Sequence, residues 1–129
     1  MYIEHLAIWV TDLEKTRQFY EQYFGAKAGE KYENPQKNFS SYFLSFDSGS
    51  RLELMHKPEI PDLGRTSEQQ RRGIIHFAIS VGSENAVNEL TEKLRRDGYE
   101  ILGETRWTGD GYYESVVADP EGNIVEITI

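Results

Sequence analysis

The chain contains one segment twice, and each copy carries a histidine and a glutamate at matching points. Residues 3–10 and 74–81 are similar stretches that contain His5 and His76. Each copy closes on a strand-like stretch whose glutamate, Glu53 or Glu126, lies four residues after a glycine. The histidine and glutamate are 48 positions apart in the first copy and 50 in the second. Such repetition predicts a duplicated architecture, and two histidines with two carboxylates suit a divalent cation.

Bulk properties exclude several classes of function. The 129 residues suffice for one domain with a core of its own. The absence of cysteine excludes disulfides, thiolate metal sites and a cysteine nucleophile. A net charge of -8 argues against nonspecific nucleic-acid binding. The first residues enter a strand pattern at once, without a basic leader, and no apolar run is long enough for a membrane span, so we expect a cytoplasmic protein.

The first copy predicts a strand, a helix and three further extended segments. Residues 2–10 alternate, with Leu6, Ile8 and Val10 on the face that a helix would cover. Thr11 and Glu14 form a predicted capping box, and Gly25 is expected to end the helix in the left-handed conformation. The extended segments are a loop or irregular edge strand at residues 30–39 and a hairpin of strands 41–46 and 51–55.

The second copy repeats this order. Ser83 is expected to cap a helix that Gly98 ends. Residues 119–122 have the composition of a type I turn between two strands. The strands of this copy are predicted at residues 75–81, 99–102, 113–118 and 123–129. The sequence therefore predicts the order βαβββ twice.

Strand alternation predicts where the four side chains point. His5 and His76 lie opposite the helix-covered faces, and Glu53 and Glu126 alternate with apolar neighbours. If each sheet curls with its helix outside, all four side chains line the concave interior. Ordinary strand histidines and solvent-facing glutamates are the alternative, with Arg51 as an ion-pair partner for Glu53.

His56 has the opposite alternation from Glu53, so we expect it at the surface and not among the ligands. The loop at residues 108–114 allows two interpretations. It is either a plain hairpin with glycine turns or a segment that brings Tyr112 or Tyr113 to the mouth of the site.

These motifs resemble the glyoxalase I / bleomycin resistance / extradiol dioxygenase superfamily, also called vicinal oxygen chelate proteins, over essentially the full length. The matching stretches are residues 3–8, 19–25, 52–54, 76–79 and 119–126. The resemblance implies an α+β fold of two βαβββ modules, whose curled mixed sheets form a metal-binding cup. It implies a single domain over residues 1–129, with module 1 at about 1–57, a connector at about 58–73 and module 2 at about 74–129.

The resemblance also implies a ligand set and a reaction. The metal ligands would be His5, Glu53, His76 and Glu126, a set that is similar to bacterial glyoxalase I, and the ion would be Ni, Zn, Co or Mn. Four protein ligands would leave two cis positions for substrate oxygens. Glu126 is the expected catalytic base, with Glu53 as the other catalytic carboxylate. The activity would be that of a lactoylglutathione lyase, a proton transfer through a metal-bound enediolate of a 2-oxoaldehyde–thiol hemithioacetal.

Other members of the superfamily supply alternatives to this activity. A metal-dependent epimerase or thiol transferase would use the same metal with a different pocket, and the epimerase usually carries Gln at the position of Glu53. A non-catalytic small-molecule binding or resistance protein is the third alternative, which the four ligands weigh against. The expected partners are a small-molecule substrate, glutathione or another low-molecular-weight thiol as cosubstrate, and a second copy in a homodimer. Carboxylates of the thiol would need arginines, and the candidates are Arg17, Arg65, Arg71, Arg72 and Arg106.

Overall fold

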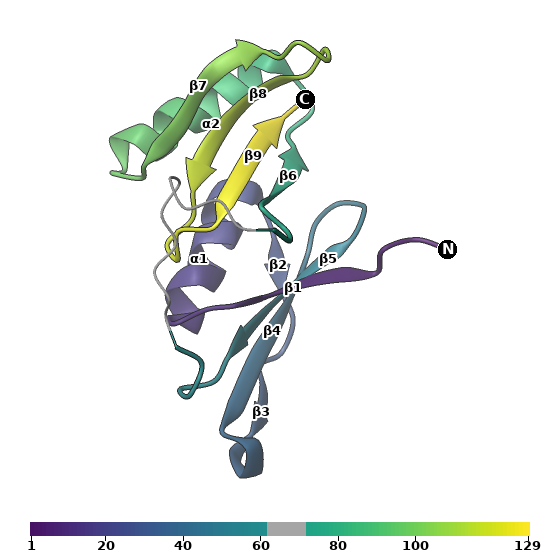
Figure 1. Cartoon of the computed structure of the whole chain (residues 1–129), viewed down its shortest axis with the longest axis vertical. Coiled ribbons are helices and arrows are strands. Elements are labelled where there is room, and N and C mark those ends of the chain that lie inside the picture. The colour runs from purple at the N-terminus through teal and green to yellow at the C-terminus, as the bar shows by residue number, and fades with distance from the viewer. Residues whose placement is uncertain (62–71) are drawn as a thin grey trace. The chain divides into compact units, whose positions relative to one another are not determined.

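The computed structural model describes residues 1–61 and 72–129, which fold as two compact units, Met1–Leu63 and Gly64–Ile129 (Figure 1). Each unit contains one α-helix and one mixed β-sheet. The α+β fold of two βαβββ-like modules is therefore confirmed. Neither helix of the described part is long and apolar enough to cross a membrane.

Unit 1 is a sheet of five strands with a helix after the first strand. The sheet has the order β1-β5-β4-β2, and β3 also pairs with β4. β1 runs parallel to β5, and the remaining pairs are antiparallel. The elements are β1 (His5–Trp9), α1 (Leu13–Phe24), β2 (Lys27–Ala28), β3 (Tyr32–Asn34), the 3-10 helix η1 (Pro35–Lys37), β4 (Phe39–Ser45) and β5 (Arg51–His56).

Unit 2 has the same topology with four strands. Its sheet has the order β6-β9-β8-β7, and β6 runs parallel to β9. The elements are β6 (His76–Ser80), α2 (Glu84–Arg96), β7 (Ile101–Trp107), β8 (Tyr113–Ala118) and β9 (Ile124–Thr128). The pair β2 and β3 of unit 1 thus occupies the place that β7 alone has in unit 2.

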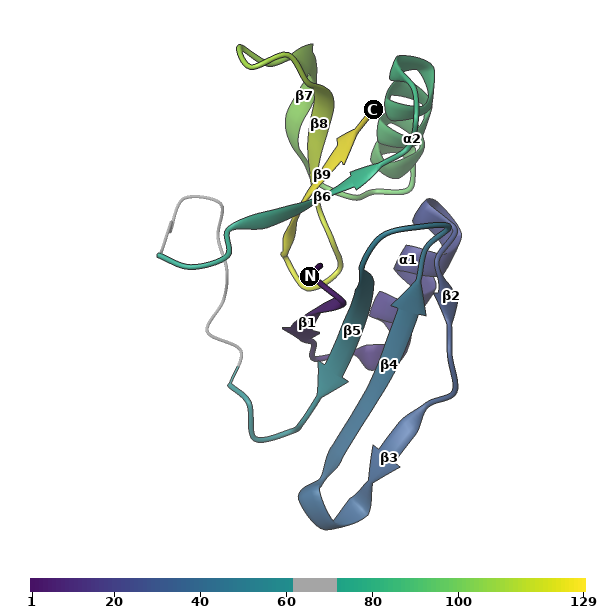
Figure 2. The same cartoon turned by 90° about the vertical axis from the view of Figure 1, so that its right-hand side faces the viewer.

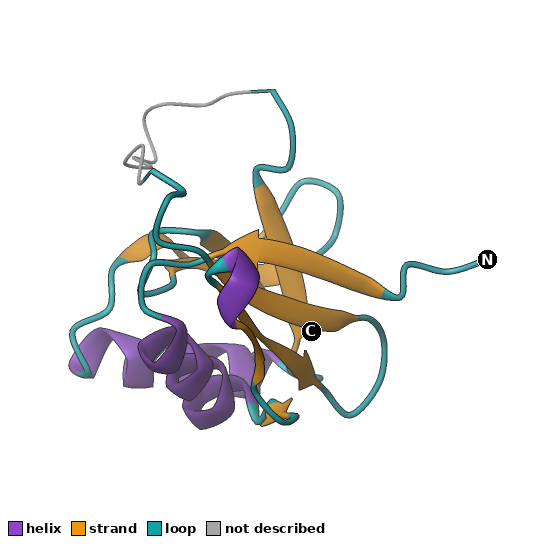
Figure 3. Cartoon of the chain, turned by 90° about the horizontal axis from the view of Figure 1, so that it is seen from below, coloured by secondary structure: helices purple, strands orange, loops and turns teal. Residues whose placement is uncertain are grey.

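Each helix covers one face of its own sheet (Figures 2 and 3). In unit 1 the apolar side of α1 meets the sheet side that carries Leu44, Leu52 and Leu54, all of them buried. In unit 2 the corresponding core contains Leu94 from α2 and Ile127 from β9, both fully buried. Burial of these side chains stabilises each unit by removing apolar surface from water. The opposite face of each sheet is the face that carries the histidine.

The start of α1 differs from the prediction. The N-cap is Asp12 and not Thr11, because the Asp12 side chain accepts a hydrogen bond from the Lys15 backbone N–H at 2.9 Å. Glu14 makes no capping box and pairs instead with Arg17 and Lys31. The predicted end is confirmed, since Gly25 has a φ of 64° and closes the helix in the left-handed region.

Other predicted boundaries match with local differences. Ser83 caps α2, and its last residue Arg96 is followed by Asp97 and the positive-φ Gly98. The strand expected at residues 99–102 is β7, which begins later and reaches Trp107. Its pairing with β8 shifts register twice, so a strict alternation does not describe it. Part of the predicted connector, residues 62–71, lies outside the described residues.

Candidate metal centre

The two units place their histidine and glutamate at equivalent positions of equivalent parallel strand pairs, β1–β5 in unit 1 and β6–β9 in unit 2. In unit 1, His5 is two residues before Ala7, and Ala7 is the register partner of Glu53. In unit 2, His76 is two residues before Ala78, the register partner of Glu126. Side chains two residues apart on a strand share a face, so each histidine lies diagonally next to its glutamate. The spacing seen along the chain is thus an equivalence in three dimensions.

The histidine and the glutamate of each pair are close enough to ligate the same cation. The Nε2 atom of His5 is 3.9 Å from Oε2 of Glu53, and Nε2 of His76 is 3.2 Å from Oε2 of Glu126. The glutamate side chains are only 14% and 20% exposed, whereas both histidines are about 40% exposed. A carboxylate that is largely removed from water needs a cation or hydrogen-bond donors, so each pair is a candidate acidic half-site with a neighbouring imidazole.

The donor atoms suit a divalent metal. Imidazole nitrogen and carboxylate oxygen are ligands of Zn, Ni, Co and Mn. Two atoms bound at right angles to one ion, at about 2.1 Å each, stand about 3 Å apart. The 3.2 Å separation in unit 2 matches this geometry, and the pair in unit 1 would close by about 1 Å. Within residues 1–61 and 72–129, no group of three or more potential ligands is assembled.

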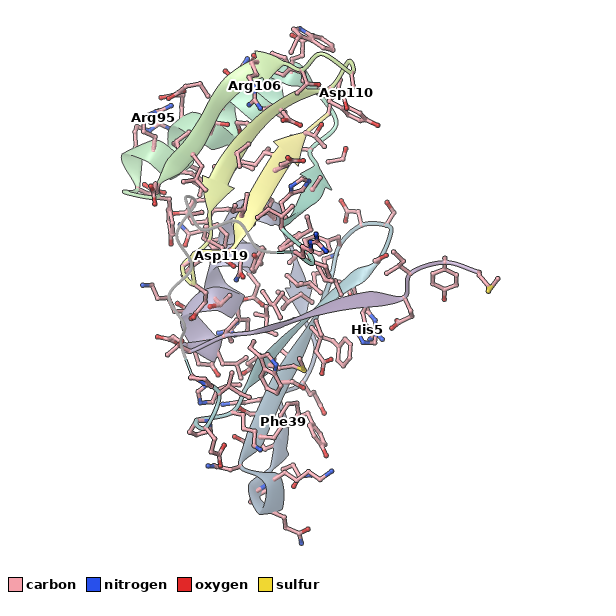
Figure 4. All side chains as sticks on the ribbon, viewed as in Figure 1. His5, Phe39, Arg95, Arg106, Asp110 and Asp119 are labelled. Carbon is pink, nitrogen blue, oxygen red and sulfur yellow. The ribbon has the colours of Figure 1, made fainter. Side chains whose placement is uncertain are left out.

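In unit 1, His5 is held by a second carboxylate. Its Nδ1 lies 2.6 Å from Oε2 of Glu4, and the other oxygen of Glu4 accepts from Arg51 Nε at 2.7 Å. The hydrogen bond to His5 lowers the pKa of Glu4, desolvation opposes this shift, and Arg51 adds to it. Arg51, which the alternative interpretation pairs with Glu53, therefore pairs with Glu4. Figure 4 labels His5 beside β1.

In unit 2, a second carboxylate that sequence reasoning missed adjoins the pair. Glu114 is buried on β8, two residues before Val116, and Val116 is the register partner of Glu126. Burial raises the pKa of Glu114, and the negative charge of Glu126 raises it further. Arg106, labelled in Figure 4, pairs with Glu114 at 3.2 Å. Alternation along residues 113–118 places Glu114 on the same face as Val116, so the strand pattern could have identified it.

Three further expectations concerned side chains near the site. His56 is half-buried and so only partly at the surface, because it lies across from Val10, whose carbonyl is 3.0 Å from its Nδ1. Tyr113 donates its hydroxyl to Asn88 of α2 at 2.8 Å, so it belongs to the helix-covered face. Tyr112 is exposed.

The proposed thiol-binding arginines divide into three groups. Arg17 is engaged by Glu14 and Glu21 on its own helix, and Arg106 by Glu114. Arg72 is exposed. Arg65 and Arg71 lie outside the described residues.

Proteins with similar sequences and structures include two named enzymes and a solved glyoxalase. The chain is 34% identical over 97 residues to the mitochondrial methylmalonyl-CoA epimerase of Bos taurus, which covers 73% of this chain and 55% of that one. It is 32% identical over 127 residues to the lactoylglutathione lyase GLX1 of Arabidopsis thaliana, covering 95% and 42%. The chain thus spans about half the length of these curated relatives. The structure of the trypanothione-dependent glyoxalase I of Leishmania major superposes with a TM-score of 0.77 at 27% identity, covering 99% and 86%.

The family follows from a match that covers almost the whole chain. Residues 2–127 match the model of the Glyoxalase/Bleomycin resistance protein/Dioxygenase superfamily. The match includes both strand pairs that carry the His–Glu pairs. The chain belongs to the Glyoxalase/Bleomycin resistance protein/Dioxygenase superfamily.

Proposed function

We propose that this protein is a metal-dependent glyoxalase I-like lyase that isomerises a 2-oxoaldehyde–thiol hemithioacetal to a 2-hydroxyacyl thioester. The observation that carries the proposal is the equivalent His–Glu pair in each unit, at 3.9 and 3.2 Å. His5, Glu53, His76 and Glu126 would together hold one divalent ion. The similarity to lactoylglutathione lyase GLX1 over 95% of this chain supports this choice of reaction.

The protein's own groups would move the proton. A bound divalent ion would polarise the substrate oxygens and lower the pKa of the adjacent C–H bond. Glu126 would accept the proton from the sulfur-bearing carbon and return it to the neighbouring carbon. No atom is added or lost, since the hemithioacetal and the thioester are isomers. Glu53, the more buried of the two glutamates, would act as the other carboxylate of the site.

Metal analysis followed by an activity assay tests the proposal. The purified protein should bind one divalent ion per set of four ligands, and His5→Ala and Glu126→Ala should each abolish stoichiometric binding. Retention of the parent's full metal content by both variants would show that the assigned site is wrong. With the metal bound, the protein should isomerise the hemithioacetal of methylglyoxal and glutathione. The rate of thioester formation measures this activity.

An epimerase is the second candidate, because the bovine methylmalonyl-CoA epimerase matches at 34% identity. Like the isomerisation, epimerisation removes a proton next to a carbonyl and returns it. The carbonyl is here that of a thioester, and the reaction would use the same four side chains. Exchange of solvent deuterium into methylmalonyl-CoA, with no turnover of the hemithioacetal, would decide for the epimerase. A protein that binds the metal and turns over neither substrate would point to the thiol transferase or to a non-catalytic binding protein.

A further inference from the structure

The imidazole of His5 is one member of a closed ring of side-chain contacts. Glu4 lies between His5 and Arg51, with one carboxylate oxygen 2.6 Å from His5 Nδ1 and the other 2.7 Å from Arg51 Nε. The Arg51 guanidinium lies over the ring of Phe43, 4.2 Å from its centroid. The Phe43 ring in turn meets the His5 ring edge to face at 5.3 Å. We call Glu4, Arg51 and Phe43 the His5 brace.

The backbone fixes the brace in place. The Arg51 N–H donates to the Glu4 carbonyl at 2.9 Å, and the Ser50 hydroxyl donates to the Ile3 carbonyl at 2.5 Å. Arg51 is also the register partner of His5 in the parallel ladder. The two charged side chains therefore meet because the strand pairing brings them together, which reduces the conformational entropy that an exposed ion pair normally costs.

Unit 2 has the same backbone positions without the brace. Ile75 occupies the position of Glu4, directly before the histidine. Ile124 occupies the position of Arg51, as the register partner of His76. Val116 pairs with Glu126 as Phe43 pairs with Glu53. The βαβββ topology therefore does not require these side chains. They are specific to the half-site that contains His5.

The brace determines which nitrogen of His5 carries the proton. A carboxylate only accepts hydrogen bonds, so the neutral imidazole must place its proton on Nδ1 to satisfy Glu4. The lone pair is then on Nε2, and this atom faces Oε2 of Glu53 at 3.9 Å. Two acceptors that face each other favour a cation between them.

We propose that Glu4 is a positioning residue that holds His5 in the Nδ1–H tautomer with Nε2 ready to ligate a metal, and that Arg51 holds Glu4. This inference rests on the metal site proposed above. A carboxylate behind a ligating histidine fixes its ring and raises its basicity, and loss of such a partner typically costs 10–100-fold in metal affinity. The two histidines of the proposed site, His5 and His76, are therefore unequal ligands.

Zn²⁺ affinity measured by chelator competition tests the brace in four variants. Glu4→Leu should weaken Zn²⁺ binding about 10–100-fold, because the acceptor is lost. Glu4→Gln should retain much of the affinity, since its amide oxygen still accepts from Nδ1–H. Arg51→Met should cause a smaller loss than Glu4→Leu. Glu33→Gln removes an exposed, Lys31-paired carboxylate of the same unit and should leave the affinity unchanged.

The ring nitrogens of His5, observed by ¹⁵N NMR, give a readout that charge alone would not move. The parent and Glu4→Gln should show a protonated Nδ1 in neutral His5, and Glu4→Leu should show Nε2–H. Equal affinity of Glu4→Leu and the parent, or an unchanged tautomer, overturns the brace and leaves the proposed function standing. Equal losses in Glu4→Gln and Glu4→Leu also overturn it, because charge would then be the cause. A parent that binds Zn²⁺ no better than His5→Ala defeats the proposed metal site, and the brace with it.

Discussion

At the scale of single residues, the two His–Glu pairs are equivalent in register but have different neighbours. Glu126 has a second buried carboxylate, Glu114, on the adjacent strand of its own unit. Glu53 has Ser41 at the corresponding place, opposite Met55. Burial raises the pKa of Glu114, and the negative charge of Glu126 raises it further. Glu53 and Glu126 thus differ in their charged neighbours, and we keep Glu126 as the proposed base.

Isosteric substitutions test that assignment. Glu126→Gln should lower kcat of the isomerisation by about 10²–10⁴-fold, the usual contribution of a general base. Glu53→Gln should lower it less, because an amide oxygen can still ligate and this group does not carry the proton. Both variants are assayed at saturating metal, with bound metal measured on the same samples. A larger loss in Glu53→Gln would assign the base to Glu53.

The cap of α1 gives a second prediction at this scale. Asp12→Ala should reduce the free energy of unfolding by about 1 kcal/mol, because the Lys15 N–H loses its acceptor. Urea unfolding measures the change. Thr11→Ala, at the position that the capping-box pattern favoured, should cost less. A larger loss of stability for Thr11→Ala would show that Thr11 caps the helix.

At the scale of elements, a charged cluster joins α1 to its sheet. Glu14 of α1 accepts from the Tyr42 hydroxyl of β4 at 3.1 Å and from Arg17 Nε at 3.1 Å, and Lys31 lies 3.3 Å away. Desolvation opposes the ionisation of Glu14, but hydrogen bonds from Arg17, Tyr42 and Lys31 outweigh it, so the pKa of Glu14 is lowered. The helix is thus held to the sheet by a polar contact as well as by its apolar side.

This lowered pKa predicts how acid affects the helix contact. A carboxyl group with a lowered folded-state pKa stabilises the protein fully above its unfolded pKa, and the stabilisation is lost as pH falls through the folded value. Glu14→Gln should therefore destabilise the protein at pH 7, and its difference from the parent should shrink below about pH 4.5. Urea unfolding at both pH values measures the difference. Glu84→Gln, a first-turn carboxylate of α2, controls for the helix dipole; a pH-independent effect of Glu14→Gln would contradict the prediction.

At the scale of the whole molecule, the chain is two units of one topology, and each carries one His–Glu pair. We propose that the protein is a homodimer. Two-module chains of this kind have sheet edges that need cover, and a symmetric pair supplies it. The four ligands of one metal would then come either from one chain or from two.

Mixing of variants distinguishes the two assemblies. If sites are shared between chains, His5→Ala and His76→Ala proteins mixed and allowed to exchange subunits should regain about a quarter of the metal sites, since half the dimers are mixed and each contains one intact site. If all four ligands come from one chain, mixing should restore none. Each variant incubated alone is the control. A strictly monomeric protein with full metal occupancy would contradict the dimer.

The repeat, the fold class and the His–Glu pairs were predictable from the sequence, because they depend on local properties. Alternation along a strand decides the face on which a side chain lies, whatever the strand pairs with. His5 and Glu53 could therefore be assigned to the same kind of face from their own neighbours. The glycine at position 25 likewise ends α1 through its own backbone conformation.

The contacts around the ligands depended on the tertiary structure. Glu4 meets Arg51 and Glu114 adjoins Glu126 only through the register between strands, which the sequence does not state. Arg51 could pair with Glu53 on its own strand or with Glu4 across the ladder, and the ladder decided for Glu4. Alternation predicts a face, but the partner on that face is set by how distant segments align, and that alignment minimises the free energy of the folded unit as a whole.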